Sequence, residues 1–227
     1  MTGPNITPYP VANIIWGLDD VESEDLTAFE LGYRISAGKN FSLDTAAFYY
    51  IYNNLGSYSY GGTDNVFDET PPHIISYLYV GNNQDAQTWG FEFSANWQPL
   101  DFMRLKGTYS FINMHFDLKG PAETTFSPYS KEDTPEHQAT LSSYIDLPWN
   151  TECDVSLRYV DELEDGAVGD YTEMDVRLGW TPNDHVEVSV CGKNLLHDKH
   201  SEILGSYILS QSAEVYRSVY GKVTLKY

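Results

Sequence analysis

His197 and His200 are the residues whose types and spacing come closest to metal chemistry, because they lie three positions apart and flank Asp198. Protein zinc sites use three or four ligands, so one histidine pair falls short of a complete set. The alternative is that these residues belong to a polar loop just outside a strand and bind no metal. The sequence therefore predicts no metal site and no cofactor.

A run of acidic residues could supply the carboxylate oxygens that Ca²⁺ prefers. It lacks the regular spacing of a calcium-binding loop, and a solvated extracellular loop explains it better. The run comprises Asp161, Glu162, Glu164, Asp165 and Asp170.

Hydrolase chemistry would need a nucleophile and a base within hydrogen-bond reach on one face. His137 and Ser142, expected on the inner side of the sheet, are about five residues apart on one strand and too distant to act together. We therefore expect no enzymatic activity. Cys153 and Cys191 fall on opposite faces in the expected register and should not form a disulfide, which needs converging side chains.

The composition and charge of the chain disfavour several classes of protein. The 227-residue chain carries a net charge of −20, which disfavours nucleic acid as a partner because phosphate binding depends on Lys and Arg. Its longest apolar run, Ala46 to Tyr52, is far shorter than the roughly 20 residues of a membrane-spanning helix. Barrel strands need only about 9 to 11 residues and can be apolar at every second position. Met1 to Pro10 show no export signal, so the protein is either cytoplasmic or has its true N-terminus upstream.

Alternation with period two predicts strands throughout the chain. Between Thr151 and Leu163 the apolar residues fall at every second position, and Tyr171 to Trp180 repeats the pattern. Soluble sandwiches and membrane barrels both alternate in this way. Alternation alone therefore leaves both architectures open.

The connections distinguish the two architectures. Short and long connections alternate along the chain, which is typical of a transmembrane barrel with short periplasmic turns and long extracellular loops. The short connections are 38–40, 98–101, 147–150 and 181–184, and the long ones lie near 56–85, 118–136, 164–170 and 197–214.

This interpretation predicts an all-β fold, an antiparallel transmembrane β-barrel segment of about nine strands. The expected strands are 28–37, 41–55, 86–98, 101–116, 137–147, 151–163, 170–180, 185–196 and 215–227. Ile74 to Val80 are expected to extend the strand at 86–98 outside the membrane, because a further crossing would reverse the direction of two strands. Nine antiparallel strands cannot close alone, so the sheet must continue in a longer chain or in another chain.

The same strand directions predict a periplasmic girdle of aromatic side chains at one membrane level. Its members are Phe41, Trp97, Trp149, Trp180 and Tyr227. The alternative is that these are scattered core aromatics.

Five stretches, taken in order, resemble the TonB-dependent outer-membrane receptors. They are ESEDLTAFELGYR (22–34), TWGFEFSANWQP (88–99), DTPEHQATLSSYIDLP (133–148), GKNLLHDKHSEI (192–203) and RSVYGKVTLKY (217–227). The resemblance implies a 22-stranded barrel filled by an N-terminal plug, with an energy-coupling box ahead of the plug. The plug, the box and the early strands have no counterpart in this sequence.

The resemblance also implies a domain organisation, a location and partners. Residues 28–227 would form the C-terminal part of the receptor barrel, and residues 1–27 a loop leading into it. The protein would lie in the outer membrane of a Gram-negative bacterium, in contact with lipid. Its partners would be the missing plug and barrel strands and, through them, the TonB energy-coupling complex. Family members import large scarce ligands such as ferric siderophores, haem, cobalamin or glycans, and a ferric siderophore-like ligand is expected here.

Residues on the upper inner face would meet a ligand that enters from outside, and tyrosine suits binding because it offers area and a hydroxyl. The expected ligand-path residues are Tyr50, Tyr52, Gln138, Tyr171 and Tyr216. They could instead pack only against loops or the plug. Two other functions stay open at this point, namely a soluble secreted β-sandwich that binds a ligand and a small autonomous outer-membrane channel.

Overall fold

A computed structural model describes residues 9–121, 124–128, 134–163, 168–203 and 213–226. These residues form strands and their connections, and none of them belongs to a helix that could span a membrane.

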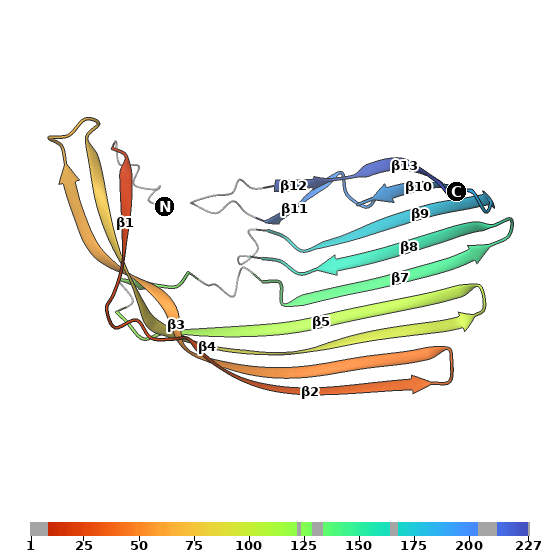
Figure 1. The fold of residues 1–227 in the computed structure, drawn as a ribbon, viewed down its shortest axis with the longest axis horizontal. Coiled ribbons are helices and arrows are strands. Elements are labelled where there is room, and N and C mark those ends of the chain that lie inside the picture. The colour runs from red at the N-terminus through yellow and green to blue at the C-terminus, as the bar shows by residue number, and fades with distance from the viewer. Residues whose placement is uncertain (1–8, 122–123, 129–133, 164–167, 204–212, 227) are drawn as a thin grey trace. The chain divides into compact units, whose positions relative to one another are not determined.

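One large sheet contains nine strands that follow one another in the order of the chain (Figure 1). They are β2 (Asp25–Ala37), β3 (Phe41–Val66), β4 (His73–Leu100), β5 (Met103–Leu118), β7 (His137–Leu147), β8 (Thr151–Val160), β9 (Tyr171–Asn183), β10 (Val186–Lys193) and β13 (Ser218–Leu225). Two short strands, β1 (Val11–Gly17) and β6 (Thr125–Phe126), join the same sheet, and β11 (Lys199–Ile203) pairs with β12 (Ala213–Tyr216) in a separate hairpin. The predicted antiparallel barrel segment of about nine strands is confirmed.

The chain divides into two compact units, which share the long strands β2 to β5. The larger unit holds residues 29–49, 89–113 and 131–227, with the short turns of the hairpins at one end of its strands (Figure 1). The smaller unit holds residues 1–28, 50–88 and 114–130, of which residues 9–28, 50–88, 114–121 and 124–128 are described.

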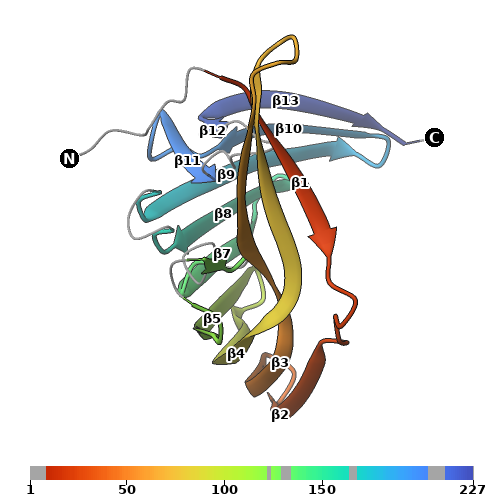
Figure 2. The same ribbon diagram turned by 90° about the vertical axis from the view of Figure 1, so that its left-hand side faces the viewer.

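Within the smaller unit, residues 74–80 are part of β4, as predicted. The expectation of a long loop over 56–85 is wrong, because β3 continues to Val66 and only residues 67–72 separate it from β4. The Gly- and Ser-containing stretch after Leu55 resembles a loop in sequence, yet its backbone groups pair, and the Tyr58 ring packs against Phe126 at 5.6 Å. β1 runs parallel to the extension of β4, with Val11 opposite Ile74 (Figure 2).

The two faces of the larger unit differ in chemistry. In the antiparallel register of β8 and β9, Val155 lies opposite Val176 and Cys153 opposite Leu178 on one face, whereas Asp154 lies opposite Arg177 on the other. We call these the outer and the inner face. No Asp, Glu, Lys or Arg occupies an outer position of β8 or β9.

The outer face is exposed rather than packed. Leu157 and Leu178 are 39% and 51% exposed, so these outer-face side chains do not lie in a dry interior between two stacked sheets. The buried apolar residues among those described are few, namely Leu55, Ala86, Val160, Val168 and Cys191. An exposed apolar face of this extent is typical of a surface that lies against lipid or a protein partner, and the two-sheet sandwich is excluded for the described residues.

Cys153 and Cys191 are free thiols on opposite faces, as predicted, because Cys191 lies opposite Arg177 on the inner face. The placement of His137 on the inner face is wrong. His137 lies opposite Phe111 on the outer face, where its Nδ1 is 2.7 Å from the Tyr109 hydroxyl, while Ser142 contacts Ser156 on the inner face.

A charge placed on the outer face should destabilise the sheet in a membrane, whereas the same charge one residue away should be tolerated. Leu141→Lys places an ammonium group on the outer face of β7, and we expect it to lower the free energy of unfolding by about 2–4 kcal/mol. Thr140→Lys, at the same depth on the inner face, is the matched control and should change it by less than about 1 kcal/mol. Unfolding of both variants by denaturant in lipid vesicles measures the difference. Equal losses would contradict the assignment of the faces.

Candidate functional site

The inner face of the larger unit carries a network of ion pairs centred on Arg177 in β9. Its guanidinium donates to Glu152 at 2.7 Å and Asp154 at 3.0 Å on one neighbouring strand, and to Glu187 at 2.9 Å on the other. The planar, multidentate guanidinium suits such a set of acceptors. On the same face Lys193 donates to Asp175 at 2.8 Å. These contacts offset part of the negative charge of four carboxylates that would otherwise repel one another across three strands.

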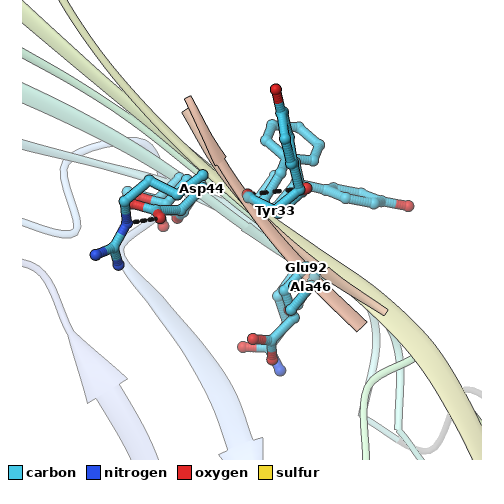
Figure 3. Close-up of a pocket in the computed structure, with 15 residues that line it drawn as sticks. Tyr33, Asp44, Ala46 and Glu92 are labelled. Carbon is cyan, nitrogen blue, oxygen red and sulfur yellow. Dashed lines mark hydrogen bonds and ion pairs between the residues drawn. The ribbon is translucent and has the colours of Figure 1, made fainter. Parts of the chain in front are cut away.

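A hollow of about 640 Å³ lies on the inner face across β2, β3, β4, β5 and β7. Small side chains such as Gly32, Ala46 and Ser94 leave the space open, and Thr108, Ser110 and Thr140 add hydroxyl groups to its lining. Arg34 pairs with Asp44 at one side of it. Figure 3 shows Asp44, Ala46 and Glu92 on one side of the sheet and the Tyr33 ring on the other. The hollow can therefore accept a polar group that enters from the inner side.

A second polar cluster lies on the inner face, at the ends of β8 and β9 that are remote from the short turns. Glu173 is buried, and one of its carboxylate oxygens is 2.9 Å from His197 Nδ1 while the other accepts the backbone N–H of Leu196 at 3.1 Å. Tyr171 stacks on His200 with ring centroids 4.3 Å apart. The cluster anchors the segment after β10 onto the sheet.

In the structure, His197 and His200 both contact the buried carboxylate of Glu173. Among the residues that the structure describes, no group of three or more His, Cys, Asp or Glu side chains is arranged to hold a metal ion. Sequence reasoning missed the role of Glu173 because it lies 24 positions before His197. Of the acidic run at 161–170, Glu164 and Asp165 lie outside the described residues.

The predicted ligand-path residues occupy different places. Gln138 lines the hollow and lies opposite Val160, which in turn lies opposite Tyr171, so these three share one row across β7, β8 and β9. Tyr216 in β12 is exposed, and its hydroxyl donates to Glu214 at 3.1 Å. In the smaller unit, the rings of Tyr50 and Tyr52 meet edge to face at 6.4 Å. Contact of these residues with a ligand stays a prediction.

Four of the predicted girdle residues lie near the short turns of the larger unit. Phe41 begins β3, and Trp97 and Trp180 lie near the ends of β4 and β9. Trp149 occupies the turn between β7 and β8 with a φ of 62°, and its side chain is 88% exposed. Tyr227 lies outside the described residues. A shared membrane level stays a prediction.

Sequence reasoning also missed an aromatic cluster at the other end of the outer face. The Phe111 ring lies 5.1 Å from Trp89 and 4.9 Å from His137, and Phe91 and Phe93 continue the cluster along β4. Alternation in residues 88–97 places the aromatic residues of β4 on one face. The pairing of His137 with Tyr109 appears only in the register of β5 and β7.

The β11–β12 hairpin holds an exposed ion pair of its own. Lys199 donates to Glu214 at 2.7 Å, and the pKa of Glu214 lies below its ordinary value because of this hydrogen bond and a second one from Tyr216. The contribution of Glu214 to the hairpin is therefore present above the ordinary glutamate pKa and is lost as pH falls through the lowered one.

Removal of the Arg177 guanidinium should destabilise the inner face. Arg177→Gln leaves three carboxylates without their shared cation, and we expect the free energy of unfolding to fall by about 2 kcal/mol. Lys222→Gln removes one positive charge from the same face, at a position where the described residues show no ion pair, and is the control. Denaturant unfolding in detergent micelles measures both. The assigned role of Arg177 fails if the two variants lose the same stability.

A family model described as TonB dependent receptor-like, beta-barrel, matches residues 2–195. No curated protein sequence matches the chain.

Three solved structures illustrate the likeness in fold. The FrpB iron transporter from Neisseria meningitidis (F3-3 variant) is 17% identical with a TM-score of 0.69, over 95% of this chain and 33% of the transporter. The siderophore receptor PiuA from Acinetobacter baumannii is 18% identical with a TM-score of 0.67, over 91% of this chain and 29% of the receptor. The copper transporter OprC is 13% identical with a TM-score of 0.63, over 91% of this chain and 33% of that transporter.

At these identities the solved structures show a shared fold, and the chain spans about a third of their length. The family model adds a match over most of the chain. The exposed apolar outer face and the charged inner face agree with that match. The protein therefore belongs to the TonB-dependent receptor β-barrel family and is a protein of the Gram-negative outer membrane.

Proposed function

We propose that this chain forms part of the barrel wall of an outer-membrane receptor that takes up a large, scarce ligand with energy relayed through TonB. The observation that carries the proposal is the division of one sheet into an exposed apolar face and an ion-paired polar face, together with the family match. A wall of this kind separates lipid from a water-filled interior.

The sheet must be completed by further strands. Among the described residues, the sheet order ends at β2 on one side and at β13 on the other. A strand edge exposed in lipid leaves backbone groups unpaired at several kcal/mol each. We propose that residues 28–227 pair at these edges with further barrel strands, that residues 1–27, which include β1 and the first residues of β2, lead into the barrel, and that a plug segment relays the contact with the TonB complex.

The ligand that we propose is a ferric siderophore-like complex. Three proteins with the same fold are an iron transporter, a siderophore receptor and a copper transporter. In this chain, support comes from a hollow lined by hydroxyl groups and from Tyr171 and Tyr216, which lie at the ends of β9 and β12. We assign ligand contact to Tyr50, Tyr52, Gln138, Tyr171 and Tyr216.

Neither of the other functions has comparable support. A small autonomous channel would need a closed sheet, and the described strands β2 and β13 are not paired with each other. The family is one of receptors and transporters, and we propose no catalytic step for this chain.

Uptake measurements test the proposal directly. Cells that express the full receptor should accumulate iron from one member of a panel of ⁵⁵Fe-labelled hydroxamate and catecholate siderophores, and deletion of TonB should abolish the accumulation. Accumulation without TonB, or from no member of the panel, would contradict the proposed function.

A pair of variants tests the ligand path separately. Tyr216→Ala removes an exposed ring in β12, and we expect the half-saturating siderophore concentration to rise about tenfold, as the loss of a modest contact predicts. Tyr33→Ala removes a ring from the outer face and is the control. If the two variants behave alike, Tyr216 is not a ligand contact, whatever the outcome of the TonB test.

A further inference from the structure

β1 forms an open edge of the sheet in the smaller unit. It pairs in parallel with residues 74–80 of β4 along its whole length, without a shift in register (Figure 2). Among the described residues, no strand pairs with the other side of β1. An edge strand presents a row of unpaired N–H and C=O groups, which makes it a template for a further strand.

Two hydrogen bonds show which backbone groups of β1 are used. The Ile74 N–H donates to the Pro10 carbonyl at 2.9 Å, just before the start of the strand. The Leu18 N–H donates to the Val80 carbonyl at 3.3 Å, just after its end. Because the backbone groups of successive strand residues point to opposite sides, the even-numbered residues face β4. The residues that direct their N–H and C=O groups to the open side are Val11, Asn13, Ile15 and Gly17.

The open edge lacks the features that protect such strands in other proteins. Charged residues, proline and bulges are the common protections. The sequence of β1, VANIIWG, contains no charged residue and no proline, and its pairing with β4 has no bulge. Val11, Ile15 and Trp16 are each at least half exposed. An added strand would cover the backbone groups and these side chains together.

Exposed carboxylates flank the open edge at both of its ends. Two of them follow β1 directly, and in the described part of the chain neither makes an ion pair or a side-chain hydrogen bond. Two more lie near the start of β1, since the adjacent Phe67 ring is 4.9 Å from the ring of Tyr9. The two pairs are Asp19 with Asp20 and Asp68 with Glu69.

The charge of the smaller unit favours a basic partner. Among its described residues, Asp and Glu outnumber Lys and Arg ten to one, and Lys119 is already paired with Asp85 at 2.7 Å. A second copy of this chain would bring like charges together at the edge, which opposes pairing. A basic side chain near Asp19 would also meet the indole of Trp16, which lies beside Tyr79 on one face.

We propose that the open edge of β1 binds an extended segment of a partner protein by strand addition, and that this segment carries basic residues at both ends of a short apolar stretch. Hydrogen bonds between the two backbones and the covered apolar side chains supply affinity, while the flanking carboxylates select the basic ends. The site does not depend on the proposed uptake function, because it requires only the edge and its charges.

Binding of a peptide to the full receptor in detergent micelles tests the site. The probe is a fluorescent peptide with two arginines at each end of Val-Thr-Val-Thr-Val, and fluorescence anisotropy measures its dissociation constant. We expect saturable binding that weakens as salt is added, because exposed charges are screened. A peptide with glutamates in place of the arginines should not bind. One with prolines at its three central positions keeps its charge and should bind at least tenfold more weakly. Equal binding of the three peptides would overturn the proposal.

Two variants of one β1 residue test strand addition from the side of the receptor. Ile15→Pro removes an N–H that faces the open side, and proline is tolerated at such edge positions. We expect it to raise the dissociation constant of the peptide at least tenfold. Ile15→Thr keeps the N–H and is the matched control, with a change of less than about twofold. Equal affinities of the two variants would contradict strand addition.

The carboxylates are tested by a double variant. Asp19→Asn combined with Asp20→Asn removes the two charges that follow β1, and we expect peptide binding to weaken about fivefold, as the loss of exposed ion pairs predicts. The salt dependence of binding should become shallower. An unchanged salt dependence would contradict the assigned role of these carboxylates.

Amide hydrogen exchange identifies the side of β1 that the peptide occupies. The peptide should slow exchange of the Asn13 and Ile15 amides at least tenfold, whereas the Ala12 and Ile14 amides, which face β4, should change little. Protection of Ile14 in Ile15→Pro would show that β1 stays paired, which separates loss of the site from loss of the fold. Slow exchange of Asn13 and Ile15 without peptide would show that another segment or a second copy covers the edge, and would overturn the proposal.

Discussion

A β-strand has only two faces. In the larger unit of this protein, one face suits lipid and the other suits water. Apolar side chains of β8 and β9 stand exposed on the outer face, while Asp154 and Arg177 face each other on the inner one. Because the side-chain period is two, a shift of one residue in register would move every charge into lipid. Register is therefore the constraint on which both the membrane face and the polar wall depend.

The ion pairs of the inner face reduce the repulsion among its carboxylates. Arg177 joins carboxylates from the strands on both sides of it, so the positive charge lies at the centre of its acidic neighbours. In a chain with a net charge of −20, basic residues are scarce, and their placement beside clustered carboxylates limits repulsion along the wall. The hollow beside β4 and β5 differs, because small side chains such as Ala46 and Ser94 leave space beside the charged residues of its lining.

Local patterns in the sequence predicted much of the fold but little of its contacts. Alternation and the order of the turns predicted nine strands, the faces of Cys153 and Cys191, and the place of residues 74–80 in β4. The extension of β3 to Val66 could not be predicted from its glycines and serines, because backbone pairing with other segments holds it. For the same reason the contact of Glu173 with His197 was missed, since it joins residues that are distant in sequence.

Trp149, in the turn after β7, depends on the surroundings of the protein for its stability. Trp149 adopts a left-handed backbone conformation that costs a non-glycine residue about 1–2 kcal/mol. Its indole is 88% exposed, so contacts with its own chain do little to offset that cost. We expect the compensation to come from phospholipid headgroups, where an indole is stabilised. In that case Trp149→Gly would relax the turn in detergent and yet weaken its hold on a bilayer.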